Sequence, residues 1–111
     1  MFAPRLRFAQ CVREHMKHLT AAESSLLLDK IGELLTHEPL LETRHRKPLR
    51  PNPLAPWELR AGSLRAFYEV RLPEREPAER ELEAPANVVY VLAVGKKERN
   101  VLRIAGEVVK T

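Results

Sequence analysis

The sequence has few of the residues that tie small proteins together or place them in membranes. Its 111 residues include four glycines and one cysteine, Cys11, which excludes a glycine-rich fibrous chain, an intrachain disulfide and a cysteine cage for a metal ion. No uninterrupted apolar stretch approaches the roughly 20 residues that span a bilayer, and the first residues lack the apolar run of a signal peptide. We therefore expect a cytoplasmic protein with no membrane partner.

The charged residues are unevenly distributed along the chain. Lys and Arg outnumber Asp and Glu by 19 to 15, a net charge of +4 that leaves the class of partner open. Between Arg44 and Arg65 the basic residues face a single acid, Glu58, whereas glutamates recur in segment 73–86. The length is that of one globular domain, so we expect a single domain over 1–111 with a basic middle and an acidic loop at 73–86.

Two helices are predicted near the start of the chain. After a short strand over 6–8, apolar residues recur at helical spacing from Phe8 to about Leu19. Thr20 followed by Glu23 has the pattern of a capping box, which marks the beginning of a second helix, and Pro39 is the latest point at which that helix can end. The predicted product is a helical hairpin, with Cys11 as a buried or half-buried filler and His15 and His18 on the surface.

Strand patterns fill the rest of the chain. Four prolines make 48–56 an extended, stiff connector. Alternation around turn residues predicts a β-hairpin, and a continuous apolar run predicts a strand buried on both faces. The predicted segments are strands 57–60, 64–72, 88–94 and 101–104, with turns at 61–63 and 95–100. The fold class is α+β, with the N-terminal helical hairpin packed on one face of a small, mostly antiparallel twisted β-sheet.

Alternation also assigns residues to the two faces of that sheet. In strand 64–72, Leu64, Ala66 and Tyr68 share the core face, while Arg65 and Phe67 point to the opposite face. We therefore expect Arg65 to contribute little to packing and to be available for a ligand. Trp57 is expected to anchor the core.

Three segments together resemble the RelE/ParE family of toxins from prokaryotic toxin–antitoxin modules. They are 56–60 (Pro-Trp-Glu-Leu-Arg), 64–70 (Leu-Arg-Ala-Phe-Tyr-Glu-Val) and 91–99, which ends in Gly-Lys-Lys-Glu-Arg. The resemblance implies a compact type II toxin whose sheet carries a concave basic face and which a cognate antitoxin protein holds inactive. RelE-like members cleave messenger RNA on the ribosome without a metal or other cofactor, by attack of the ribose 2′-hydroxyl on the adjacent phosphate.

The resemblance also implies which residues form the site. Arg60, Arg65 and Lys97 match basic residues of the RelE-like site, where positive groups would hold the phosphate and stabilise the charge of its transition state. Glu58 stands where some ribonuclease members have a lysine. It could act as a general base if its pKa rises, or form a salt bridge with Arg60 or Arg65. These four residues are the predicted catalytic set.

Further contacts to the RNA phosphates are expected from Lys47, Lys96, Arg99 and Arg103. Arg103 stands where many ribonuclease members have a tyrosine or histidine, and this departure favours an alternative, a ParE-like protein that poisons DNA gyrase through protein contacts. A third reading is a non-catalytic module that binds the antitoxin and represses their shared operon. The acidic segment 73–86 is either a solvated loop or a lid over the basic face.

Overall fold

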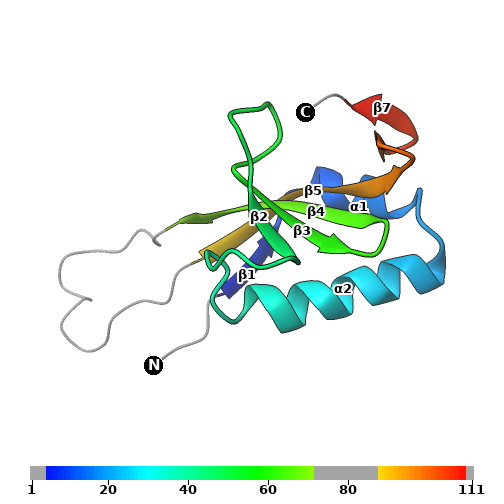
Figure 1. The fold of residues 1–111 in the computed structure, drawn as a ribbon. Coiled ribbons are helices and arrows are strands. Elements are labelled where there is room, and N and C mark those ends of the chain that lie inside the picture. Colours follow the sequence, from blue (N-terminus) through cyan, green and yellow to red (C-terminus); the bar gives the residue numbers. More distant parts are fainter. Residues whose placement is uncertain (1–4, 72–87, 110–111) are drawn as a thin grey trace, which may run out of the picture.

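The computed structural model describes residues 5–71 and 88–109, which form an α+β fold with a mostly antiparallel sheet, as predicted (Figure 1). The acidic segment predicted at 73–86 lies outside the described residues. No helix in the described part of the chain is long and apolar enough to cross a membrane. The elements are, in order, β1 (Arg5–Phe8), α1 (Cys11–Met16), α2 (Ala21–Leu35), β2 (Arg46–Pro48), β3 (Trp57–Ala61), β4 (Leu64–Arg71), β5 (Val88–Glu98), β6 (Val101–Ile104) and β7 (Glu107–Val109).

Strand β5 is the centre of the sheet. The strand order is β2-β3-β4-β5-β6-β7, with every pair antiparallel, and β1 pairs with β5 in parallel. Along one edge β5 pairs with β4, and along the other it pairs first with β1, up to Val91, and then with β6, from Lys96. The apolar run of β5 is mostly buried, as predicted.

The predicted turn at 95–100 is wrong in extent, and two short strands were not predicted. Strand β5 continues to Glu98, and the hairpin turn is reduced to Arg99 and Asn100, whose φ angles are 52° and 65°. Two consecutive residues with positive φ are typical of the type I′ turns that match the twist of a hairpin. The strands that the sequence did not reveal, β2 and β7, have three residues each, too few for a visible alternation.

A β-bulge in β5 shifts the alternation of its side chains. Phe67 lies opposite Ala93 and Tyr68 lies opposite Val91, so Leu92 is an extra residue without a partner in β4. An extra residue reverses which side chains point to which face beyond it. As a result Lys96, opposite Leu64, lies on the face covered by the helices, here the helix face, and Lys97 lies on the opposite face, here the outer face.

The two helices differ from the expected hairpin. The capping box is present, with Thr20 Oγ1 accepting from the Glu23 amide and the Glu23 carboxylate accepting from the Thr20 amide, and α2 begins at Ala21. Helix α1 ends at Met16 rather than near Leu19, because the next three amides bond to carbonyls three residues back and tighten the chain into turns. Helix α1 packs against β5, whereas α2 packs against β3 and β4, so the hairpin is confirmed only in part.

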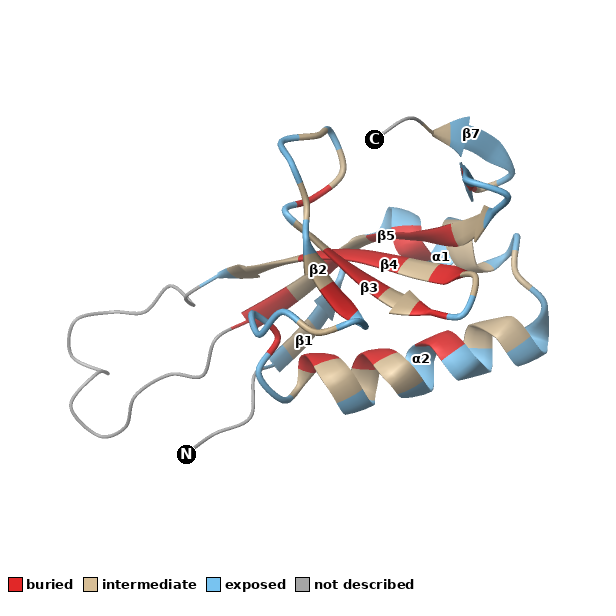
Figure 2. Cartoon of the chain, in the orientation of Figure 1, coloured by how far each residue is buried: buried red, intermediate tan, exposed pale blue. Residues whose placement is uncertain are grey.

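Apolar side chains are buried on both faces of the sheet. Figure 2 marks buried residues along β3, β4 and β5 and on α2. On the helix face, residues of α2 such as Leu27 and Ile31 pack on Tyr68, and Trp57 packs beside it with ring centroids 6.1 Å apart, as expected of a core anchor. On the outer face a smaller group, the outer cluster, is covered in part by residues of the proline-rich segment and of β7. The outer cluster consists of Ala55, Phe67, Ala93, Leu102 and Ile104.

The proline-rich segment is a closed loop rather than the extended connector that its prolines predict. The amide of Leu49 donates to the carbonyl of Pro56 at 2.8 Å, which brings the ends of the loop together. The side chain of Asn52 accepts from the amides of Leu54 and Ala55 and donates to the carbonyls of Arg50 and Ala55. This loop and β7 stand above the outer face on either side (Figure 1).

Arg46, a buried residue of β2, fixes the end of α2. Its guanidinium donates to the carbonyls of Leu34, His37 and Leu41 at 2.8 to 3.1 Å. These oxygens lie at the end of the helix and in the segment that follows, where intrahelical partners are lacking. A positive group at this end also opposes the negative end of the helix dipole. Nearby, burial raises the pKa of the Tyr68 hydroxyl, which donates to the carbonyl of Pro39 at 2.6 Å.

We predict that Arg46→Ala lowers the free energy of unfolding by about 3 kcal/mol, because three carbonyls in partly buried hydrogen bonds lose a charged donor. The matched control is Arg44→Ala, which removes an exposed arginine two residues away and should change stability by less than about 0.5 kcal/mol. Urea denaturation of both variants measures the difference. Equal midpoints for the two variants would show that Arg46 is not required for the end of α2.

Candidate functional site

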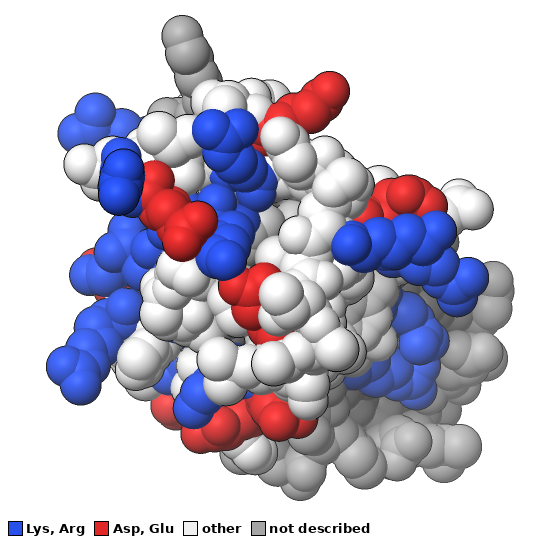
Figure 3. Space-filling view, turned by 90° about the vertical axis from the view of Figure 1, so that its right-hand side faces the viewer, with Lys and Arg blue, Asp and Glu red and all other residues white. Residues whose placement is uncertain are grey.

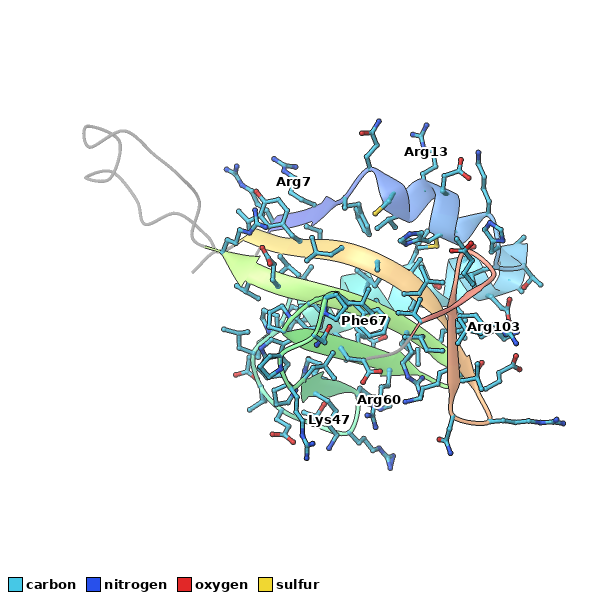
Figure 4. The ribbon with its side chains drawn as sticks, turned by 90° about the horizontal axis from the view of Figure 1, so that it is seen from above. Arg7, Arg13, Lys47, Arg60, Phe67 and Arg103 are labelled. Carbon is cyan, nitrogen blue, oxygen red and sulfur yellow. The ribbon has the colours of Figure 1, made fainter. Side chains whose placement is uncertain are left out.

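The outer face carries most of the predicted catalytic residues in two cross-strand rows. Lys47, Glu58 and Phe67 are register partners across β2, β3 and β4. In the next row, Arg60 lies opposite Arg65. Figure 4 shows Lys47, Arg60 and Phe67 on this side of the sheet, with Arg103 apart from them on β6. Residues far apart in the sequence are thus brought together on one surface.

Glu58 binds both arginines. The carboxylate is buried, with a side-chain exposure of 6%, and its Oε2 accepts from Arg60 Nε at 3.2 Å. Its Oε1 lies 3.2 Å from Arg65 Nε. Two guanidinium groups therefore compensate one buried carboxylate, which is the arrangement a buried charge requires. Of the two alternatives for Glu58, the geometry favours the salt bridge.

Arg65 is more constrained than its place on the outer face suggested. Its side chain is only 14% exposed, and its Nη1 donates to the carbonyls of Gly62 and Leu64 at 2.7 and 2.8 Å. The Nε–H is not directed well enough at Glu58 for a hydrogen bond, so that contact is ionic. Burial lowers the pKa of Arg65, with Glu58 acting in the opposite direction, although an arginine remains ionised. Arg65 therefore stabilises the β3–β4 turn, contrary to the expectation that it contributes little to packing.

Arg60 and Lys97 are the cationic groups of this cluster that are exposed enough to meet a ligand, although the Nε of Arg60 is engaged by Glu58. The Arg60 side chain is 41% exposed, and its backbone amide donates to the carbonyl of His45 at 2.8 Å, which fixes its place in β3. The amide of Lys97 donates to the carbonyl of Ser63 at 2.7 Å, so Lys97 lies beside the β3–β4 turn. At the rim, the ammonium of Lys47 lies 3.6 Å from the carboxylate of Glu42.

The structure separates Lys96 and Arg103 from this cluster. The two residues are cross-strand partners in β5 and β6, and because of the bulge they lie on the helix face. The Lys96 ammonium lies 2.5 Å from the Glu23 carboxylate at the start of α2 and 4.0 Å from Glu98, and the hydrogen bond to Glu23 raises the pKa of Lys96. The single cleft expected from the sequence is therefore divided between two faces, with Arg99 at the hairpin tip between them.

Gly95 permits the close approach of β6 to the outer face of β5. A Cβ atom on Gly95 would lie 2.4 Å from the carbonyl oxygen of Arg103 and 2.8 Å from a side-chain carbon of Ile104. Both distances are shorter than a contact between non-bonded atoms allows, so only glycine fits this position. In the Gly-Lys-Lys sequence, the glycine is therefore required by the packing of β6 on β5, apart from any role of the two lysines.

Two residues of α1 that the sequence did not assign to a site complete the edge of β5. Between the end of its pairing with β1 and the start of its pairing with β6, β5 leaves backbone groups without a strand partner. Cys11 Sγ donates to the carbonyl of Leu92 at 3.3 Å, and His15 Nδ1 accepts from the amide of Val94 at 3.3 Å. Residues four apart lie on the same side of a helix. Cys11 is exposed, which corrects its prediction as a buried or half-buried filler.

The contact with Val94 fixes the tautomer of His15. A backbone amide can only donate, so Nδ1 accepts and the proton of the neutral ring is on Nε2. Burial, and to a smaller extent the neighbouring His18, lower the pKa of His15 from 6.5. His15 therefore presents an N–H donor rather than a cation. Among the described residues no group of three or more His, Cys, Asp or Glu side chains is placed to hold a metal ion.

Among the described residues, acidic side chains lie between the positive ones. Figure 3 views the end of the molecule at the right of Figure 1, and there Lys and Arg side chains are interrupted by acidic ones. Glu58 and Glu42 on the outer face and Glu23 and Glu98 on the helix face each lie beside a cation. Attraction for a polyanion is therefore local to the cations that have no carboxylate beside them, rather than spread over the whole face.

We predict that Glu58→Gln lowers the free energy of unfolding by about 3 kcal/mol, because it leaves two guanidinium groups beside a neutral side chain in a buried place. The matched control, Glu42→Gln, removes the exposed carboxylate paired with Lys47 and should cost less than about 0.5 kcal/mol. Chemical denaturation of the two variants gives both values. A cost for Glu58→Gln as small as that of the control would mean that the carboxylate is dispensable to the fold.

We predict that His15 makes stability depend on pH. Because folding lowers its pKa below 6.5, the unfolded chain binds more protons as the pH falls, so stability present above pH 6.5 is lost as the pH falls through that value toward the folded pKa. In His15→Asn the amide oxygen can still accept from Val94 without titrating, so the wild type should lose stability relative to this variant between about pH 7 and pH 5. His37→Asn, at an exposed histidine, is the control. Parallel unfolding curves for the wild type and His15→Asn over this range would contradict the prediction.

Comparison of the chain with family models, with curated proteins and with solved structures found no match. The assignment of a function therefore depends on the residues and their geometry.

Proposed function

We propose that this protein is the toxin of a type II toxin–antitoxin module, of the RelE/ParE type, and that it stops translation by cutting ribosome-bound messenger RNA without a metal. The observation that carries the proposal is the pairing of Arg60 and Arg65 with the buried carboxylate of Glu58 on the outer face, with Lys97 on the same face beside the β3–β4 turn. A sheet face that holds a partly exposed arginine and a lysine in fixed positions suits a phosphate group.

The proposed chemistry is transfer within the RNA strand. The 2′-oxygen of a ribose forms a bond to the adjacent phosphorus, the bond to the 5′-oxygen of the next nucleotide breaks, and the 2′-hydroxyl proton is lost while the leaving oxygen gains one. The extra negative charge in the transition state lies on the phosphate oxygens, which Arg60 and Lys97 would stabilise. Glu58 and Arg65 would act as positioning residues, since Glu58 holds Arg60 and Arg65 holds the turn beside Lys97.

The same proposal assigns a partner and a compartment. A cognate antitoxin with an acidic segment would cover the outer face, because Arg60 and Lys97 attract carboxylates as well as phosphates and charge complementarity raises the rate and specificity of association. A ribosome-bound substrate requires that the protein work in the cytoplasm.

One observation favours a second function, poisoning of DNA gyrase through protein contacts. Arg103, at the position where many ribonuclease members have tyrosine or histidine, is exposed on the face away from Arg60 and Arg65. It therefore supplies neither an acid–base group nor a stacking ring beside them. A protein that acts without cutting RNA would not need such a group.

We predict that Arg60→Ala slows messenger RNA cleavage by about 100-fold or more and abolishes growth arrest, because loss of one donor to the transition state costs roughly 3 kcal/mol. The test is induced expression without antitoxin, with protein synthesis and DNA synthesis followed separately by radiolabelled precursors and cleavage mapped by primer extension. Arg44→Ala, at an exposed arginine of the same basic segment, is the control and should remain toxic. Arrest of DNA synthesis with translation intact would instead support the gyrase function.

A further inference from the structure

A second cationic surface lies at the β5–β6 hairpin, on the helix face. A hollow of about 470 Å³ there is bordered by α1 and the turn after it, by both strands of the hairpin and by the turn before β7. Its polar lining consists of His15, His18, Lys96, Glu98, Arg99 and Arg103. Three cations and two imidazoles thus surround a space that Glu98 borders as the single carboxylate among its lining residues.

The donors around this hollow differ in how far they are already engaged. Lys96 is held by Glu23, and the Glu98 side chain is 67% exposed. Arg99 and Arg103 are exposed and form no ion pair with a carboxylate in the described ranges 5–71 and 88–109. His15 lines the hollow with its Nδ1 occupied by Val94, which leaves Nε2–H as a neutral donor. Two free guanidinium groups and a fixed N–H donor suit the oxygens of a phosphate group.

The backbone of Arg99 provides an independent observation. Arg99 is the first residue of the type I′ turn, with φ of 52°, a conformation that favours Asn, Asp or Gly and disfavours longer side chains. Residues held in disfavoured backbone conformations occur most often where their side chains have a function. An arginine in this place gives the hairpin tip a positive charge but makes the turn less stable than Asn, Asp or Gly would.

The hairpin also connects this hollow with the outer face. Lys97 points to the outer face, Arg99 is at the tip, and Lys96 and Arg103 lie on the helix face. A strand of nucleic acid that crosses the tip would therefore meet positive groups on both sides. In Figure 4, Arg103 lies at the β6 side of the molecule, away from Arg7 and Arg13 on β1 and α1.

We propose that the hollow formed by His15, Arg99 and Arg103 binds a phosphate group, and that in the RNA-cutting function proposed above it holds a second phosphate of the same single-stranded RNA, beyond the one at Arg60. The phosphate could be an internal diester or a terminal monoester, since both present the same oxygens to the two guanidinium groups.

The test uses a substitution that should improve the fold while it removes binding. Arg99→Asn places a favoured residue in the type I′ turn, so its melting temperature should equal or exceed that of the wild type. Inorganic phosphate titrated into the wild type should shift the NMR signals of the His15 and His18 rings, and Arg99→Asn with Arg103→Ala should abolish these shifts. Arg13→Ala, which removes an exposed arginine of α1 outside the hollow, should leave them unchanged.

Binding of a short oligouridylate, measured by fluorescence anisotropy at several salt concentrations, tests the role toward RNA. The double variant should bind about 10-fold more weakly, with a salt dependence reduced by roughly one to two phosphate contacts. An oligonucleotide with a 5′-phosphate that binds more tightly than one without would identify the terminal monoester as the ligand. Equal binding would identify the diester.

Unchanged ring shifts, or unchanged oligonucleotide binding, in a folded double variant would overturn the proposal. The outcome is independent of the proposed function, because Arg60→Ala leaves the hollow intact. Phosphate shifts in a wild-type protein whose induced expression does not arrest translation would support the phosphate site while the RNA-cutting function fails.

Discussion

The fold depends on the pairing of β5 with three other strands. One edge of β5 is filled by β4, and the opposite edge is shared by β1, which comes from the start of the chain, and β6, which comes from its end. A strand with partners on both edges and apolar residues on both faces must be covered on all sides. Helix α1 closes the remaining gap through Cys11 and His15, so hydrogen bonds to backbone groups of the sheet add to the core packing of Val12 in holding the helix.

The outer face combines a structural and a ligand-binding use of charge. A buried carboxylate held by two guanidinium groups is expensive to desolvate and gains little net stability, yet it fixes three side chains relative to one another. Glu58 and Arg65 are used in this way, and Arg60 remains half free beside them. The outer cluster lies on the same face, and one of its members, Phe67, is the register partner of Glu58.

Features governed by neighbours in the sequence could be predicted, and those governed by distant contacts could not. The capping box at Thr20, the β3–β4 hairpin and the placement of Arg65 and Phe67 opposite the helices follow from spacing over a few residues. Three features depend on partners far along the chain. They are the parallel pairing of β1, the hydrogen bonds of Arg46 to the end of α2, and the contact of His15 with Val94. The sequence predicted which residues are candidates for the site. It did not predict on which face of the sheet each lies, because nothing in the apolar run of β5 marks Leu92 as an extra residue.

That extra residue has an evolutionary consequence. In a strand that cannot form a bulge, one inserted residue would turn every later side chain to the opposite face. In β5 the bulge absorbs Leu92, so loss of this single residue would restore simple alternation while Lys96 stays opposite Leu64 and Lys97 stays on the outer face. A one-codon difference in length at this point can therefore leave the positive charges on their present sides of the molecule, and related chains with and without the extra residue would keep the same ligand-binding faces.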